Sequence, residues 1–113
     1  MTNLTEKKCK ACEGDMLPLV PHEIAEYMKE LPEGWQVFDN KKIEKEFLFT
    51  DFVRAMAFVD MIADVAEGEG HHPDIHIHYN KVRIELWTHA IDGLSENDFI
   101  VAAKIERMLS VFI

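Results

Sequence analysis

The stretch from Asp74 to Trp87 limits the possible folds more than any other part of this chain. Apolar side chains occupy every second position in 75–79 and again in 82–86, whereas they recur at helical spacing in the preceding segment. Alternation places successive side chains on opposite faces of a β-strand. Since Asn80-Lys81 separates the two runs, the pattern predicts a hairpin whose two-residue turn keeps both apolar sets on one face.

The predicted turn at Asn80-Lys81 also sets the register of this hairpin. It pairs Tyr79 with Val82, Ile77 with Ile84 and Ile75 with Leu86 on the apolar face, and His78 with Arg83, His76 with Glu85 and Asp74 with Trp87 on the polar face. Continued past Pro73, the same register pairs His72 with His89. Directly opposed residues have Cβ atoms about 5 Å apart. We therefore expect His89 to lie beside the histidines at 71–78.

The other segments complete an α+β pattern. Pro21 begins a short amphipathic helix to about residue 31, and 35–38 and 43–49 are typical of strands around a turn at 39–42. A long helix follows a cap at Thr50 or Asp51 and ends before Gly70, and a last helix follows the capping-box-like 95–98 and runs to about residue 111. The order α-β-β-α-β-β-α has no parallel crossover, so it predicts a four-stranded antiparallel sheet with three helices on one face.

The long helix carries two apolar stripes. The wider one is the expected core face and contains Phe52, Ala55, Met56, Val59, Ile62, Ala63 and Ala66. The narrower one contains Phe58, Met61 and Val65. It is compatible either with a widely buried helix or with a contact between subunits.

Length and charge exclude several classes of protein. A chain of 113 residues with 48% hydrophobic residues is the size of one domain. Its net charge of −9 disfavours binding to nucleic acid or to an anionic membrane surface. No apolar run approaches the roughly 18 residues of a transmembrane helix, and the polar N-terminus does not resemble a signal peptide. We therefore expect a cytoplasmic protein.

The first twenty residues are expected to form a flexible N-terminal extension to a domain that spans 21–113. This extension contains the only two cysteines, Cys9 and Cys12, in a C-x-x-C motif. A structural zinc site usually needs four ligands, so one chain supplies half a site at most. The motif is compatible with reduced thiols in a tail, with a metal site shared between subunits or with histidines, or with redox chemistry.

Four of the six histidines fall in the eight residues 71–78. Imidazole titrates near neutral pH, so this cluster favours proton transfer or metal binding. His71, His72 and His89 could together protonate a leaving hydroxide and accept a neighbouring N–H proton, as a dehydration requires. Alternatively, His76 and His78 could bind a metal from one strand face, although a solvated sheet face on which they oppose Glu85 and Arg83 is the stronger explanation. A third possibility is a non-enzymatic dimerisation or interaction module.

A gapped motif extends this cluster along the chain. It consists of Glu67, His71-His72-Pro73, Tyr79, His89 and Asp98, with Tyr79-Asn80-Lys81-Val82, Thr88-His89 and Gly93-Leu94-Ser95-Glu96-Asn97-Asp98 around it. The motif resembles the signature of the pterin-4a-carbinolamine dehydratases, also called 4a-hydroxytetrahydrobiopterin dehydratases. The resemblance covers roughly 21–109.

The resemblance implies an activity and a site. The activity is removal of water from a 4a-hydroxytetrahydropterin to give the quinonoid dihydropterin, in recycling of the tetrahydrobiopterin used by aromatic amino-acid hydroxylases. The pterin is the substrate, and no metal or other cofactor is expected. The resemblance also implies a homodimer or homotetramer. It makes His71, His72 and His89 catalytic and places the substrate-binding positions at Glu67, Gly70, Pro73, Trp87, Thr88 and Asp98.

Overall fold

The computed structural model describes residues 4–10 and 16–112, so Cys12 lies outside the described residues. The helices are α1 (Pro21–Met28), α2 (Phe52–Glu69) and α3 (Glu96–Phe112), and two short 3-10 turns are η1 (Leu4–Glu6) and η2 (His89–Ile91). The strands are β1 (Gln36–Phe38), β2 (Lys42–Leu48), β3 (Asp74–His78) and β4 (Lys81–Leu86). The predicted order α-β-β-α-β-β-α is confirmed.

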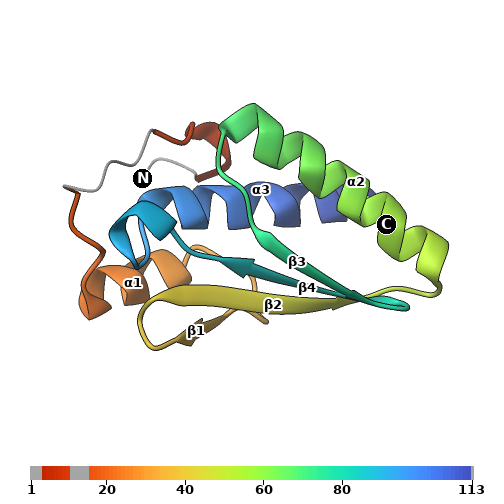
Figure 1. Cartoon of the computed structure of the whole chain (residues 1–113), viewed down its shortest axis with the longest axis horizontal. Coiled ribbons are helices and arrows are strands. Elements are labelled where there is room, and N and C mark those ends of the chain that lie inside the picture. The colour runs from red at the N-terminus through yellow and green to blue at the C-terminus, as the bar shows by residue number, and fades with distance from the viewer. Residues whose placement is uncertain (1–3, 11–15, 113) are drawn as a thin grey trace.

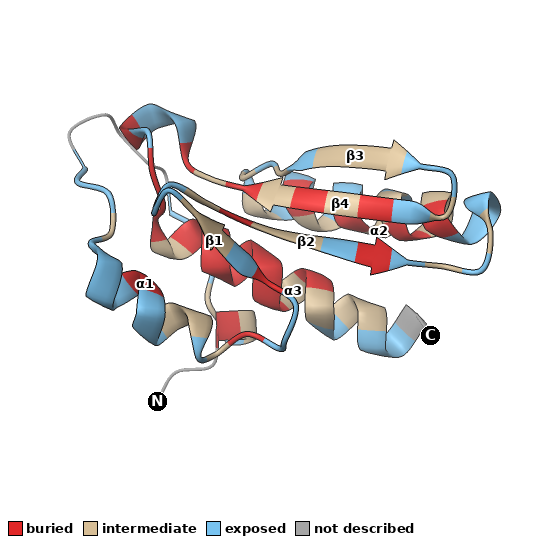
Figure 2. Cartoon of the chain, turned by 90° about the horizontal axis from the view of Figure 1, so that it is seen from below, coloured by how far each residue is buried: buried red, intermediate tan, exposed pale blue. Residues whose placement is uncertain are grey.

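The strands form one antiparallel sheet in the order β1-β2-β4-β3. Helices α2 and α3 lie on one side of it and α1 contacts α3, and within residues 4–10 and 16–112 no helix covers the other face of the sheet (Figures 1 and 2). Alternation explains which side chains meet the helices: Ile43 of β2 and Val82, Ile84 and Leu86 of β4 are all fully buried. None of the described helices is long and apolar enough to cross a membrane.

Helix α2 is capped as predicted, because the Asp51 side chain accepts a hydrogen bond from the Arg54 backbone N–H at 2.8 Å. Its core face was predicted correctly in part: Ala55, Ile62 and Ala66 of the wider stripe are buried. Phe58 is 0% exposed and packs against the rings of Phe47 and Phe49, whereas Phe52 of the predicted core stripe is 47% exposed. Since Phe58 is in the core, the narrower stripe cannot serve as a whole as a subunit contact. The buried face of the helix therefore combines Ala55, Ile62 and Ala66 of the wider stripe with Phe58 of the narrower one.

The register of the second hairpin also differs from the prediction. The turn consists of Tyr79 and Asn80, so His78 pairs with Lys81, His76 with Arg83 and Asp74 with Glu85. The apolar faces are unchanged, because the register is shifted by two residues. Asn80 remains in the ladder with β2: its carbonyl accepts from the Phe49 N–H at 2.8 Å, and its side chain donates to the Phe49 carbonyl at 2.9 Å. This pairing moves the turn one residue back, and Tyr79 takes a φ of 53°.

Part of the predicted N-terminal extension packs on the folded chain. Leu4 is 2% exposed in the hydrophobic core, and the Lys7 ammonium lies 2.6 Å from the Glu96 carboxylate of α3. In Figure 1 the segment lies beside the C-terminal end of α2 and along α3. Because the N-terminal segment lies on one side of α3 and the rest of the chain on the others, every residue from 97 to 103 of α3 is buried. The division of the chain at residue 20 stays a prediction.

Candidate active site

One pocket of about 510 Å³ lies where α2, β4 and α3 meet the N-terminal segment. Its lining comprises Cys9, Lys10, Glu69, Gly70, His71, His72, Trp87, Thr88, His89, Ala90 and Asn97. The three histidines that the sequence singled out therefore share one pocket. His71 and His72 come from the junction between α2 and β3, and His89 comes from η2, just after β4.

The end of α2 directs His71 into this pocket. Gly70 adopts the left-handed conformation with a φ of 67°, and both its N–H and that of His71 donate to the Ala66 carbonyl. Glycine adopts this conformation without the steric cost that a Cβ atom adds. The chain therefore leaves the helix in one turn, and His71 faces the start of α3.

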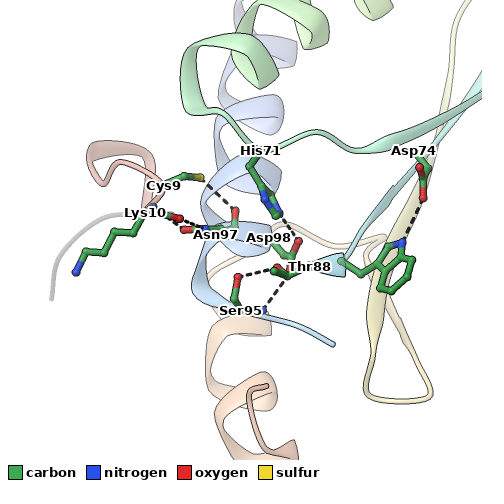
Figure 3. A network of polar contacts seen from close by, with 9 residues as sticks. Cys9, Lys10, His71, Asp74, Thr88, Ser95, Asn97 and Asp98 are labelled. Carbon is green, nitrogen blue, oxygen red and sulfur yellow. Dashed lines mark hydrogen bonds and ion pairs between the residues drawn. The ribbon is translucent and has the colours of Figure 1, made fainter. Parts of the chain in front are cut away.

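A buried carboxylate holds His71. The Nε2 of His71 lies 2.6 Å from Oδ1 of Asp98, and Asp98 is 0% exposed (Figure 3). The other oxygen, Oδ2, accepts hydrogen bonds from the Thr88 hydroxyl at 2.8 Å and the Ser95 backbone N–H at 2.9 Å. The Ser95 hydroxyl lies 2.8 Å from that of Thr88. Asp98 thus caps α3, as the capping-box pattern predicted, and also fixes one nitrogen of His71.

The other two histidines have different partners. The Nε2 of His72 contacts the Glu67 carboxylate at an exposed position. The His89 ring packs on Trp87 with 3.9 Å between centroids and 31° between planes. Trp87 is oriented in turn by its indole N–H, which donates to Asp74 at 3.3 Å. An isolated bridge between Thr88 and Gly93 closes the loop that presents His89.

The predicted site residues divide into two groups. Gly70, His71, His72, Trp87, Thr88 and His89 line the pocket. Glu67, Pro73 and Asp98 do not: Glu67 contacts His72 from outside, Asp98 lies behind His71, and Pro73 only links His72 to β3. The predicted pairing of His72 with His89 is absent because β3 begins at Asp74.

Five residues that line the pocket were not predicted as site residues: Cys9, Lys10, Glu69, Ala90 and Asn97. Glu69 accepts from the Cys9 backbone N–H at 2.8 Å and lies 2.5 Å from the Lys104 ammonium. Burial raises the pKa of Glu69, but these two hydrogen bonds outweigh it and hold the net pKa below the ordinary value. Burial, with the Glu69 carboxylate beside it, raises the pKa of the Cys9 thiol to about 12. Three signals were available: Glu69 precedes His71 by two residues, Asn97 precedes Asp98 in the motif, and Cys9 belongs to the C-x-x-C sequence.

His76 and His78 lie outside this pocket. His76 contacts Glu85 at 3.0 Å, as a diagonal neighbour rather than the predicted direct pair. Within residues 4–10 and 16–112, no group of three or more His, Cys, Asp or Glu side chains has the geometry to hold a metal ion. These two histidines therefore belong to the polar ladder on the open face of the sheet.

Comparisons with known proteins agree with the motif. The sequence profile of the family described as "Pterin 4 alpha carbinolamine dehydratase" matches residues 17–108. A protein of Nitrosomonas europaea named "Putative pterin-4-alpha-carbinolamine dehydratase" is 50% identical over 111 residues, covering 96% of this chain and 97% of the relative. A protein of the same name from Nitrosomonas eutropha is 48% identical, covering 96% and 98%.

Two solved structures are similar as well. A "transcriptional coactivator/pterin dehydratase" from Brucella melitensis has a TM-score of 0.75 and 35% identity, covering 80% of this chain and 97% of that one. A "pterin dehydratase-like protein", described as a RuBisCO assembly factor in the alpha-carboxysome, has a TM-score of 0.58 and 26% identity, covering 67% and 89%. The profile match and the identity to full-length relatives show that this chain belongs to the pterin-4a-carbinolamine dehydratase family.

Proposed function

We propose that this protein is a hydro-lyase that converts a 4a-hydroxytetrahydropterin into the quinonoid dihydropterin and water by histidine acid-base catalysis. The observation that carries the proposal is the hydrogen bond from His71 to buried Asp98 inside a pocket that His72 and His89 also line. Family membership supports the dehydratase reaction itself. The assignment of histidines to steps rests on the geometry.

The reaction needs two proton movements. The C4a–O bond breaks, and its electron pair leaves with the hydroxyl, which takes a proton and departs as water. The N5–H bond gives up its proton, and its electron pair forms the C4a=N5 double bond. One group must therefore donate a proton and another must accept one, so substrate and products balance without an oxidant or a reductant.

His71 is suited to the step at N5. Two donors, Thr88 and the Ser95 N–H, already face Oδ2 of Asp98, and Oδ1 faces Nε2 of His71. An ionised carboxylate in this position accepts a hydrogen bond from Nε2–H, so the proton stays on Nε2 and the lone pair is on Nδ1. A neutral imidazole held in this tautomer accepts a proton at Nδ1. We propose this role for His71, with Asp98 as its positioning residue.

His72 and His89 then serve the departing hydroxyl. Both are more exposed than His71, so the product water can leave on their side of the pocket, and solvent can return a proton to the histidine that donated one. Trp87 fixes the ring plane of His89, and Glu67 contacts His72. Gly70, Pro73 and Thr88 shape the pocket wall or the path of the chain around it.

The same proposal covers the wider role. The substrate is a small pterin, no metal or further cofactor takes part, and the product is returned for reduction in tetrahydropterin recycling, for example beside an aromatic amino-acid hydroxylase. We also propose a homodimer or homotetramer, as the family resemblance implies. The name of the Brucella protein gives a role as transcriptional coactivator beside that of pterin dehydratase, and the name of the carboxysomal protein gives a role in RuBisCO assembly. No surface feature described above favours such a role here.

The test is the dehydration of a freshly generated 4a-hydroxytetrahydropterin, followed by ultraviolet absorbance. We expect His71→Ala, His72→Ala and His89→Ala each to lower kcat by about 10²-fold or more, the usual contribution of a proton-transferring group. His76→Ala is the matched control and should keep the wild-type rate, because it removes an imidazole outside the pocket. Equal loss in the control, or full activity in all three variants, would contradict the assignment.

A further inference from the structure

The N-terminal segment forms part of the pocket that holds the three histidines. Cys9 and Lys10 both line it, and in Figure 3 they lie across the start of α3 from the histidine and aspartate pair. The family profile begins only at residue 17, so these two residues lie outside the region that it describes. The match to the Nitrosomonas europaea relative, in contrast, covers 96% of the chain. A close relative thus shares nearly the whole length of the chain, extension included.

The side chain of Asn97 attaches this segment to α3 by bonding both the backbone N–H and the backbone carbonyl of Lys10. Its side-chain oxygen accepts from the Lys10 backbone N–H at 3.0 Å, and its side-chain nitrogen donates to the Lys10 carbonyl at 2.6 Å. Asn97 is 5% exposed, so these bonds form away from water, where an unpaired amide is costly. The Lys10 backbone is therefore held in one place relative to Asp98, the next residue along α3.

Glu69 provides the second attachment. One oxygen accepts from the Cys9 backbone N–H at 2.8 Å, and the other contacts the Lys104 ammonium. The Cys9 thiol also contacts the Asn97 carbonyl at 3.6 Å. Glu69 of α2 and Asn97 of α3 thus fix two successive residues of the segment, Cys9 and Lys10. Lys7, which pairs with Glu96, extends the attachment to the preceding turn.

We propose that residues 9 and 10 form a wall of the pterin pocket and that Glu69 and Asn97 are the positioning residues that hold this wall against bound substrate. The inference rests on the proposed dehydratase function and adds a binding element to it. The wall contacts the ring system from the side of α3, and it takes no proton. Its contribution is therefore to substrate affinity, and the histidines keep the chemical step.

If the wall contributes to substrate binding and the histidines to the chemical step, loss of the wall should change KM and leave kcat nearly unchanged. In Glu69→Ala and Asn97→Ala, the wall loses one or two hydrogen bonds, and KM should rise about tenfold, the factor that roughly 1.4 kcal/mol represents. The kcat should stay within about threefold of wild type, since the hydrogen bonds that tie these side chains to the wall go to the backbone of Cys9 and Lys10, and the second oxygen of Glu69 contacts Lys104. Lys29→Ala is the control, because Lys29 is exposed on the surface beyond α1 and pairs with Glu26.

A binding measurement tests the wall without turnover. In a Cys12→Ser background, Cys9 is the only thiol, and its slow alkylation by excess iodoacetamide at about pH 9, where a small fraction of the thiol is ionised, can be followed by mass spectrometry over hours. Biopterin has no 4a-hydroxyl and cannot be dehydrated. We expect saturating biopterin to slow alkylation of Cys9 at least severalfold, because the thiol lines the occupied pocket. Asn97→Ala should weaken this protection in parallel with its higher KM.

The outcomes separate the two proposals. Unchanged KM in both variants, or a fall in kcat with KM unchanged, overturns the positioning role. If biopterin does not protect Cys9 from alkylation, residues 9 and 10 do not form a wall of the pterin pocket. This measurement does not depend on the Glu69→Ala and Asn97→Ala variants, so it remains decisive if they do not fold. If the wild-type protein does not accelerate dehydration, the proposed function fails, and the wall is judged by protection of Cys9 alone.

Discussion

Replacing Asp98 by asparagine is the most informative single change in the site. Asparagine has nearly the same shape, but one of its two oxygens becomes an NH2 group. The Ser95 N–H and the Thr88 hydroxyl both donate toward Oδ2, so the amide oxygen must take that position. The NH2 group then faces His71 Nε2, which becomes an acceptor, and the ring proton moves to Nδ1. The nitrogen proposed to accept the N5 proton is thereby blocked.

The size of the effect follows from the same contacts. Three hydrogen bonds to a carboxylate, from His71, Thr88 and the Ser95 N–H, become bonds to a neutral amide, which costs about 1 kcal/mol each, since charge-assisted bonds are roughly twice as strong. We therefore expect about 3 kcal/mol less unfolding free energy and a Tm about 12 °C lower for a domain of this size. Loss of the accepting nitrogen should lower kcat by about 10²-fold or more.

Three measurements check this prediction. Thermal unfolding followed by circular dichroism gives the Tm, the dehydration assay gives kcat, and nitrogen-15 NMR of the His71 ring shows which nitrogen carries the proton. Asp92→Asn is the matched control, because Asp92 is exposed and pairs with Lys41. If Asp98→Asn keeps wild-type kcat, or if the His71 proton is on Nδ1 in the wild-type protein, the proposed role of His71 is wrong.

Further predictions concern stability. Gly68→Ala should stabilise the protein by about 0.5–1 kcal/mol, because Gly68 is a helical residue of α2 and a Cβ atom there would meet no other atom. Gly70→Ala should destabilise it by about 1 kcal/mol, because the positive φ of Gly70 is strained for alanine. Urea unfolding curves of the two variants and the wild type test both predictions. Phe58→Ala should cost about 3–5 kcal/mol in the same assay, and a small loss would contradict its place in the core. Since the net pKa of Glu69 is lowered from 4.5, its ionised form stabilises the fold above that pH, and this contribution is lost as the pH falls through the lower folded value. The stability difference between wild type and Glu69→Gln should therefore shrink below pH 4.5, and a difference that grows there would contradict the direction of the shift.

The sequence was sufficient for the order of elements because each one carried a local signal. Pro21, Asp51 and Ser95 begin helices, Gly70 ends one, and the alternation after Asp74 specifies strands. The histidine cluster could be placed for the same reason: a helix that stops at Gly70 and a strand that starts at Asp74 leave His71 and His72 at one junction. Local chemistry determined these features, so local patterns revealed them.

Register and orientation were not available from local patterns. Alternation fixes a hairpin register only to within a shift of two residues, and the pairing of Asn80 with Phe49 on a distant strand selected between the alternatives. The apolar residues of α2 cover more than one face, so the packing of Phe58 on Phe47 decided its rotation. Leu4 is a single apolar residue among polar ones, and nothing near it in the chain indicates that it packs beside α3.

The rate at which a 4a-hydroxytetrahydropterin forms the quinonoid dihydropterin tests the central claim most directly. It is measured by stopped-flow ultraviolet absorbance with and without the protein, and with a chelator present. The account predicts an acceleration proportional to protein concentration that the chelator leaves unchanged. A rate equal to the spontaneous one would contradict the dehydratase function, and an acceleration abolished by the chelator would contradict catalysis by the histidines alone.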